Sequence, residues 1–265
     1  MKLKHLLLIL VVLTTGLGSL VWKLGFSASD LANLSFYMDL ANPSVKVVQV
    51  YPGMRKEEIA DRVGDKLGWD EGDKENFLNA HLAMNTEDLE GKYFPKTYLI
   101  DEDDNPADVT AVMLSEFEKQ TDKIKKPNSK VLNEETIIKI ASIIQREAAG
   151  KQDARLISGI IRNRIWAGMK LQMDATLQYA KGTEEDGWWP RVYSEDKEID
   201  SEYNTYMYKG LPPGPIANPG IEALKAAYNP AETKCMFYIH DKKHRIHCAE
   251  TYDKHKENIK KYLQS

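Results

Sequence analysis

An uncharged apolar segment near the amino terminus restricts this chain more than any other feature. The segment runs from Leu6 to Trp22, and Lys2 and Lys4 precede it. A helix of this length just crosses the hydrocarbon core of a bilayer. Positive charges on the short side favour a cytoplasmic amino terminus. We therefore predict that residues 6–22 anchor the chain in the cell (inner) membrane, with the rest of the chain outside the cytoplasm. A cleaved signal peptide shares both features and stays open as the alternative.

Composition excludes several classes of function. The chain has 265 residues with 36 Lys and Arg against 40 Asp and Glu, a net charge of -4. Because no long basic run is present, nucleic acid is not an expected partner. The two cysteines, Cys235 and Cys248, lack metal-ligand spacing, so the sequence indicates neither a zinc site nor a disulfide framework, and one isolated disulfide stays open. We predict no cofactor and no metal.

The chain after the anchor divides into three regions. Residues 23–43 lack sustained periodicity and are interpreted as a stalk. Residues 44–101 hold a β-branched strand, a Pro-Gly turn and two helical stretches, a small β-α-α unit that resembles the sugar-binding LysM module. A packing subdomain without a ligand is the alternative. Residues 102–265 are mainly helical, so the predicted fold class is α+β with residues 1–22 as tail and anchor.

The predicted helix over residues 134–148 carries a carboxylate in an unusual place. Asn133 can cap this helix, and its apolar face is rich in isoleucine. At about 100° per residue, Glu147 falls between Ile140 and Ile143 on the flank of that face. Burial there would raise the carboxyl pKa, as a general acid requires. The alternative is an ion pair with Arg162 or Arg164 on the next predicted helix.

Two later segments combine polar groups with a rigid backbone. The first places Gln172 and Asp174 among apolar residues just after a helix, where caps and turns are the ordinary explanation. The second follows Tyr203 and Asn204 and has four prolines within eight residues, 212–219. Proline fixes the backbone, and we expect Asn218 to cap a following helix with Pro219 at its first position.

Four motifs, in this order, carry a family resemblance. They are Phe94-Pro95-Lys96-Thr97-Tyr98, Ser142-Ile143-Ile144-Gln145-Arg146-Glu147, Leu171-Gln172-Met173-Asp174-Ala175-Thr176 and the segment from Tyr203 to Gly220. Over roughly residues 44–263 the chain closely resembles the endolytic murein transglycosylases, the MltG or YceG-like family. The resemblance implies Glu147 as the catalytic glutamate and a LysM-like subdomain near residues 44–100.

The carboxyl-terminal part departs from the family pattern. Thr251 and His255 match the family's final Thr-x-x-x-His, but His244 and His247 lack the expected aromatic neighbour. We therefore assign the histidines no role.

The resemblance also implies a mechanism and partners. A lytic transglycosylase needs one carboxylate, because the muramic acid C6 hydroxyl replaces water and leaves a 1,6-anhydromuramic end. Neutral polar groups would stabilise the charged sugar, and our candidates are Gln172, Asn204 and the carbonyls of residues 211–215, with Asp174 and Tyr203 as further substrate contacts. Peptidoglycan strands are the expected partner, and the family implies termination of glycan synthesis beside a synthase. A hydrolase with Asp174 as second carboxylate and a noncatalytic wall-binding scaffold are the alternatives.

Overall fold

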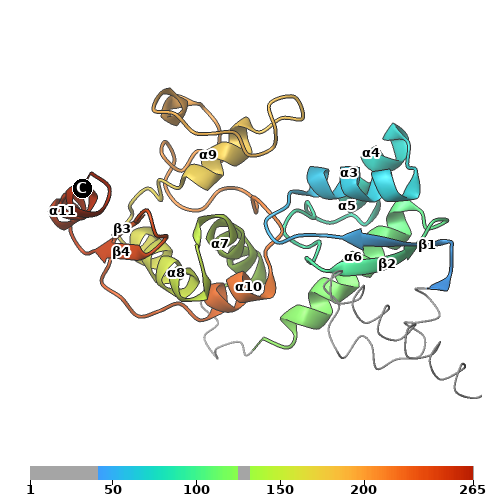
Figure 1. Cartoon of the computed structure of the whole chain (residues 1–265), viewed down its shortest axis with the longest axis horizontal. Coiled ribbons are helices and arrows are strands. Elements are labelled where there is room, and N and C mark those ends of the chain that lie inside the picture. The colour runs from blue at the N-terminus through green and yellow to red at the C-terminus, as the bar shows by residue number, and fades with distance from the viewer. Residues whose placement is uncertain (1–40, 125–131, 265) are drawn as a thin grey trace, which may run out of the picture.

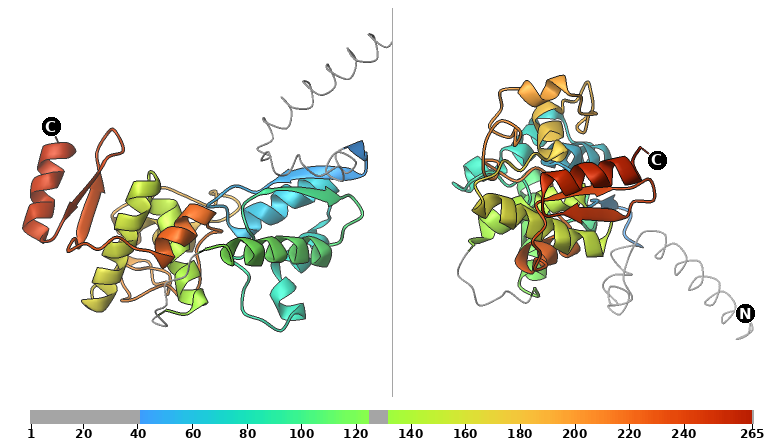
Figure 2. Two further views of the ribbon diagram at one scale, coloured as in Figure 1. Left: turned by 90° about the horizontal axis from the view of Figure 1, so that it is seen from below. Right: turned by 90° about the vertical axis from the view of Figure 1, so that its left-hand side faces the viewer.

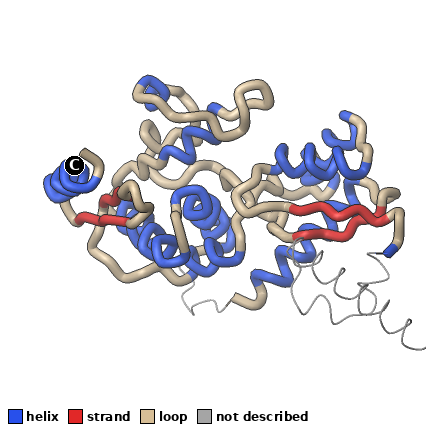
Figure 3. Tube along the Cα trace, viewed as in Figure 1, coloured by secondary structure: helices blue, strands red, loops and turns tan. Residues whose placement is uncertain are grey.

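The computed structural model describes residues 41–124 and 132–264 and shows a mixed α+β fold that is mostly helical (Figures 1 and 3). The predicted anchor at residues 6–22 and most of the predicted stalk lie outside these ranges. Within the ranges, no helix has both the length and the apolar character that a membrane crossing requires. In chain order the elements are β1 (Val45–Gln49), α3 (Lys56–Leu67), α4 (Glu71–Leu78), α5 (Ala80–Ala83), β2 (Thr97–Asp101), α6 (Pro106–Thr121), α7 (Glu134–Glu147), α8 (Lys151–Trp166), α9 (Asp174–Lys181), the 3-10 helix η2 (Glu195–Glu198), α10 (Ile221–Tyr228), β3 (Phe237–His240), β4 (Ile246–Ala249) and α11 (Tyr252–Tyr262).

The amino-terminal unit is built on the antiparallel pair of β1 and β2, with Val45 opposite Asp101. The predicted strand and two helices are present as β1, α3 and α4. β2 was not predicted, because the sequence favoured simple packing around a proline for that segment. Its residues Tyr98 and Ile100 are buried in the same core as Val48 of β1. The unit is thus closed by a strand at each end, and its likeness to LysM stays a prediction.

Helix α6 connects two hydrophobic cores. Its residues Val109 and Met113 belong to the core of the amino-terminal unit, whereas Phe117 belongs to the core of the later helices. Asn105 caps it by accepting from the amides of Ala107 and Asp108. A helix that follows the predicted boundary at residue 101 therefore contributes to both cores.

The second core is centred on α7, which packs against α8 and α10 (Figure 1). The Asn133 Oδ1 accepts from the Thr136 amide at 2.8 Å, so the predicted amino-terminal cap is confirmed. The predicted apolar face is confirmed as well, since Ile140, Ala141 and Ile144 are buried. Burial of several isoleucines, at about 25 cal/mol per Å² of apolar surface, makes this helix a major contributor to the core.

Asn218 joins the two cores instead of capping a helix. α10 begins only at Ile221, with Gly220 at its cap, so the predicted Asn218 cap is wrong. The Asn218 side chain is buried and donates to the Met54 carbonyl and to Glu90, while it accepts from the Tyr93 amide at 2.8 Å. These contacts lie across the junction of the two cores, which local sequence signals do not report.

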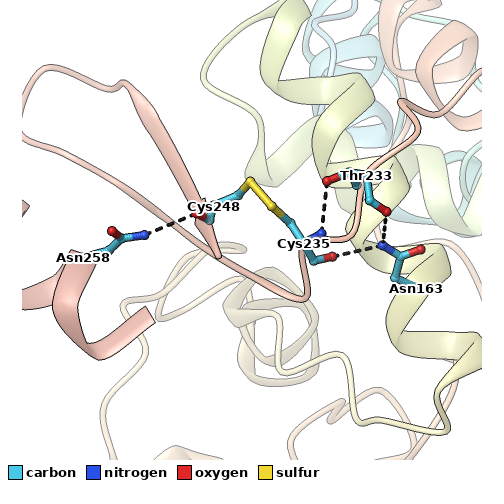
Figure 4. The surroundings of a disulfide bond; sticks show 5 residues. All are labelled: Asn163, Thr233, Cys235, Cys248 and Asn258. Atoms are coloured by element: carbon cyan, nitrogen blue, oxygen red, sulfur yellow. Dashed lines mark hydrogen bonds between the residues drawn. A yellow bond between two sulfur atoms is a disulfide. The ribbon is translucent and has the colours of Figure 1, made fainter. Parts of the chain in front are cut away.

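The β3–β4 hairpin and α11 form the end of the molecule opposite β1 and β2 (Figure 2). A disulfide joins Cys235 to Cys248 with their Cα atoms 5.8 Å apart (Figure 4). The sequence left one isolated disulfide open, and the pairing of β3 with β4 brings its two cysteines together. The disulfide fastens the start of the hairpin to its return strand.

Candidate active site

A cavity of about 420 Å³ opens where the end of α7 meets the start of α9, strand β3 and helix α11. Two carboxylates, several aromatic rings and a buried guanidinium contribute to its wall. The lining residues are Glu147, Arg164, Leu171, Gln172, Met173, Asp174, Lys197, Tyr206, Phe237, Tyr238, Ile239, Tyr252 and His255. The cavity thus unites three of the predicted site residues, Glu147, Gln172 and Asp174.

Glu147 is the last residue of α7 and is partly buried at the cavity wall. Its Oε2 accepts a hydrogen bond from the Tyr238 hydroxyl at 2.7 Å. Its Oε1 accepts from the Ala175 amide at 3.4 Å, near the start of α9. Among the described residues Glu147 has no ion pair with an arginine, so the alternative of an arginine partner is wrong.

The surroundings of Glu147 favour its protonated form. Burial raises the pKa of this carboxyl, and the nearby Asp174 adds to the rise, while the hydrogen bonds from Tyr238 and Ala175 act against it. Its place at the carboxyl end of α7 further disfavours a negative charge, because the helix dipole is negative there. A carboxylic acid that keeps its proton toward neutral pH can protonate a leaving group.

Tyr238 is the nearest partner of Glu147 and was not predicted from the sequence. Burial and the neighbouring Glu147 hold the pKa of the Tyr238 phenol well above its ordinary value. The hydroxyl therefore stays protonated and acts as a hydrogen-bond donor. The two residues are 91 positions apart in the chain, so no local pattern could have linked them.

Asp174 and Gln172 approach the cavity from the segment that leads into α9. Asp174 is the first residue of the helix and is exposed, and its Oδ1 accepts from the Tyr206 hydroxyl. Gln172 has a positive φ of 53° and donates its backbone amide to the Thr205 carbonyl. Its side chain is exposed at the cavity. This unusual backbone turn places both side chains at the opening.

The other two predicted substrate contacts lie away from the cavity wall. The Asn204 side chain is completely buried, and its amide nitrogen donates to the carbonyls of Lys197 and Ile199. Tyr203 packs against Tyr179, with ring centroids 4.7 Å apart. The structure gives both side chains a role in holding their loop, and neither they nor residues 211–215 line this cavity.

Arg164 lines the cavity and holds two segments of its wall together. This buried guanidinium donates to the carbonyls of Leu171 and Met236, and so ties the segment before α9 to the segment before β3. Burial lowers the pKa of Arg164, but a guanidinium remains charged in proteins. The sequence marked Arg164 only as a partner for Glu147.

His255 lies at the cavity wall although we assigned the histidines no role. Its ring stacks on Phe237 with centroids 5.3 Å apart, and its Nδ1 is buried without a hydrogen-bond partner in the part of the chain that the structure describes. Burial, and after it the Arg164 charge, lowers the pKa of this imidazole. The match of Thr251 and His255 to the family pattern was the signal that could have pointed here.

Residues 27–261 match the YceG-like family model. A relative from Bacillus subtilis named endolytic murein transglycosylase is 34% identical over 179 residues, which are 67% of this chain and 49% of the relative. A Streptococcus pneumoniae relative of the same name is 29% identical over 180 residues, covering 67% of this chain and 33% of its own length. The chain thus spans about half or less of the length of these curated relatives. A crystal structure of a YceG-like protein from Listeria monocytogenes has the same fold, with a TM-score of 0.66, 23% identity and coverage of 82% of this chain and 76% of that one.

Proposed function

The chain belongs to the YceG-like family, and from this premise we propose that it is an endolytic lytic transglycosylase of peptidoglycan. It would cut glycan strands between muramic acid and glucosamine and leave 1,6-anhydromuramic ends. One observation carries the proposal. Glu147 is a carboxyl group whose pKa burial raises, and it lines a cavity of about 420 Å³ together with exposed polar side chains. The names of the two relatives support the same substrate class.

The proposed reaction uses Glu147 twice. The protonated carboxyl first gives its proton to the glycosidic oxygen, and the bond from that oxygen to the muramic acid C1 breaks. The C6 hydroxyl of the same muramic acid then bonds to C1 and returns its proton to the Glu147 carboxylate. No water enters the product, and the acid is restored for the next strand.

Tyr238 suits this sequence of proton transfers. Its hydroxyl donates to Glu147 Oε2 at 2.7 Å and favours the carboxylate that forms after the first transfer. The weaker contact of the Ala175 amide acts in the same direction. Glu147 is thus held as an acid by burial and is stabilised as a base by two fixed donors.

Gln172 and Asp174 are the proposed substrate contacts that the cavity supports. Both side chains are exposed at its wall, where a sugar hydroxyl can reach them. A carboxylate such as Asp174 would also favour positive charge on the sugar ring. For Asn204 and Tyr203 we propose only an indirect role, through the loop that holds Tyr206 beside Asp174.

The position of Asp174 also supports a second candidate function. An inverting or retaining hydrolase needs two carboxylates at one sugar, and the Glu147 cavity contains two. In that reaction Asp174 would activate a water molecule or attack C1, and the new end would be a reducing muramic acid.

The remaining parts of the proposal concern location and partners. The predicted anchor at residues 6–22 would hold the cavity near newly made strands at the outer face of the cell membrane. A role in ending glycan polymerisation beside a synthase would follow from that position. The predicted LysM-like unit at residues 44–101 would hold the strand, or, in a noncatalytic scaffold, would be the only part that binds it.

Mass spectrometry of the cut ends separates these functions. The full chain and its Glu147→Gln variant are incubated with purified glycan strands, and the new ends are weighed. Anhydromuramic ends from the parent alone support the transglycosylase. Reducing ends that disappear in Asp174→Asn support the hydrolase, and strand binding without new ends from either protein supports the scaffold.

A further inference from the structure

A second cavity, of about 450 Å³, lies on the face of α8 that points away from the Glu147 cavity. Arg162 of this cavity and Arg164 of the first are two residues apart on the helix, or about 200° of rotation. The lining residues are Arg155, Gly159, Arg162, Asn163, Trp166, Tyr228, Asn229, Pro230, Ala231, Glu232 and Thr233.

The wall of this cavity is held in place by backbone contacts. Segment 229–233 crosses α8 at Gly159, where an added Cβ atom would lie 2.4 Å from the Ala231 carbonyl oxygen. The Ala231 amide donates to the Arg155 carbonyl at 2.9 Å. Asn163 donates to the carbonyls of Thr233 and Cys235 at 2.8 and 3.0 Å (Figure 4). A surface fixed by three hydrogen bonds and one close approach of the backbone is preorganised for a ligand.

Two guanidinium groups give the second cavity a positive character. Arg155 and Arg162 are seven residues apart, which is about 10 Å along the helix axis. In residues 41–124 and 132–264 neither one forms an ion pair with a carboxylate, although the exposed Glu232 also lines the cavity. Arg155 uses its Nε to donate to the Asn229 carbonyl. The cavity therefore offers more positive than negative charge.

One hydrogen-bond donor of Arg162 has no acceptor among the described residues. Its Nε is buried and has no partner among them, and burial lowers the pKa of the guanidinium. Leaving a buried donor unsatisfied is unfavourable. Because that Nε is not accessible from the cavity, an anionic oxygen there would accept from the terminal nitrogens of this half-buried guanidinium, which lines the cavity.

Trp166 provides an apolar surface beside this charge. Its indole is 70% exposed and lies 6.0 Å from the Arg162 guanidinium carbon. Exposed indole rings pack against sugar faces and aliphatic groups. The arginines and Trp166 together therefore fit a ligand that has a carboxylate next to an apolar group.

The two cavities are close in the chain. Thr233 lines the second cavity and Phe237 lines the first, and four residues of extended chain span at most about 14 Å. The Cys235–Cys248 disulfide lies between them and fixes this segment (Figure 4). One polymer could therefore occupy both cavities.

We propose that the second cavity binds a free carboxylate of a peptidoglycan stem peptide. This inference rests on the proposed function, because it takes the ligand from the strand that the Glu147 cavity would cut. The two arginines recognise the carboxylate, and Trp166 packs against the apolar part of the same stem peptide.

Binding tests this proposal without requiring cleavage. The full chain with Glu147→Gln is titrated calorimetrically with a disaccharide-peptide that has free stem carboxylates, with its amidated form, and with the disaccharide that keeps only the lactyl carboxylate. We expect the first probe to bind at least about tenfold more tightly than the other two, as a charge-assisted hydrogen bond predicts. Equal binding of the first two probes overturns the proposal, and equal binding of the first and third overturns the assignment to the stem.

Matched variants locate the site. Arg162→Gln should weaken the first probe about tenfold and leave the amidated probe unchanged. Lys234→Gln removes the same charge from an exposed residue that directly follows segment 229–233 and does not line the cavity, and this variant should bind like the parent. If both variants weaken binding equally, general attraction explains the effect and the proposal fails. Parent-like unfolding temperatures show that both variants are folded.

Cleavage assays keep this inference separate from the proposed function. If the parent produces new ends but binds strands with free and amidated stem carboxylates equally well, the second cavity is not a carboxylate site, although the proposed enzymatic function stands. If Arg162→Gln abolishes carboxylate-dependent binding but the parent produces no new ends, the binding site stands and the proposed enzymatic function is wrong.

Discussion

The junction around Glu90 and the cavity around Glu147 each contain a glutamate with little or partial exposure, but only Glu147 lines a cavity. Burial raises the pKa of Glu90 to about 8 and raises that of Glu147 as well. Glu90 is 2% exposed, and its oxygens accept from Asn218 and from the amides of Lys56 and Gly91. Glu147 has two donors, one of them at 3.4 Å, and faces a cavity.

The difference shows that a raised pKa alone does not identify a catalytic acid. At the junction every Glu90 contact is made by the protein, so no substrate can reach the proton. At the cavity Glu147 stays partly accessible. A substrate could therefore take up the proton that the raised pKa of this carboxyl retains. Access separates Glu90, which joins two cores, from Glu147, the proposed general acid.

The largest expected effect is on the reaction itself. Glu147→Gln should lower the rate of strand cleavage by about 10³-fold, because a general acid typically contributes 10²–10⁴-fold. Glu90→Gln should cleave at close to the parent rate at temperatures where it is folded. Single-turnover cleavage of both variants checks this, and equal losses would abolish the distinction between the two sites.

Stability should respond in the opposite way. Glu90→Ala leaves three donors at the junction without their partner and should lower the free energy of unfolding by about 3 kcal/mol. Glu147→Ala removes a partly buried carboxyl with fewer contacts and should cost less. Urea denaturation of both variants measures the difference. A larger loss at Glu147 would contradict the assignment of Glu90 as the structural acid.

The pH dependence of stability sharpens the contrast. The Glu90 pKa is about 8 in the folded chain and ordinary in the unfolded chain, so the folded state keeps a proton that the unfolded state releases. Its stabilising contribution is complete below the unfolded pKa and is lost as pH rises through the folded pKa. Between pH 5 and 7 the parent should lose roughly 2 kcal/mol more than Glu90→Gln. Parallel curves from denaturation at each pH would contradict this.

The smallest effect concerns the donor to Glu147. Tyr238→Phe should slow cleavage about fivefold, which is roughly 1 kcal/mol. Because the lost hydrogen bond favours the carboxylate, the Glu147 pKa should rise and the high-pH limb of kcat/KM should move to higher pH. A limb that stays in place would mean that Tyr238 only packs against the cavity. Tyr203→Phe, at a tyrosine away from the cavity wall, is the matched control.

Much of the helical framework could be predicted from the sequence. The isoleucine face and Asn133 cap of α7 follow from residues within a few turns of one another, and so does the misplaced carboxylate Glu147. Gln172 and Asp174 stood out as polar residues in an apolar segment, and both line the cavity. Local periodicity is readable because each helical turn repeats the same geometry.

Only the tertiary structure decided which groups meet Glu147. Tyr238 reaches it from a hairpin 91 residues later, and Asn204, expected at the substrate, uses its amide on the backbone of its own loop. Asn218 joins two cores where a helix cap was expected, and Cys235 meets Cys248 through the same hairpin. Such contacts depend on how distant segments pack, and residue type and local spacing do not encode that packing in a readable pattern. The sequence predicted the candidate acid Glu147 and its helix, whereas packing decided its donor, its access to the cavity and the separate position of Glu90.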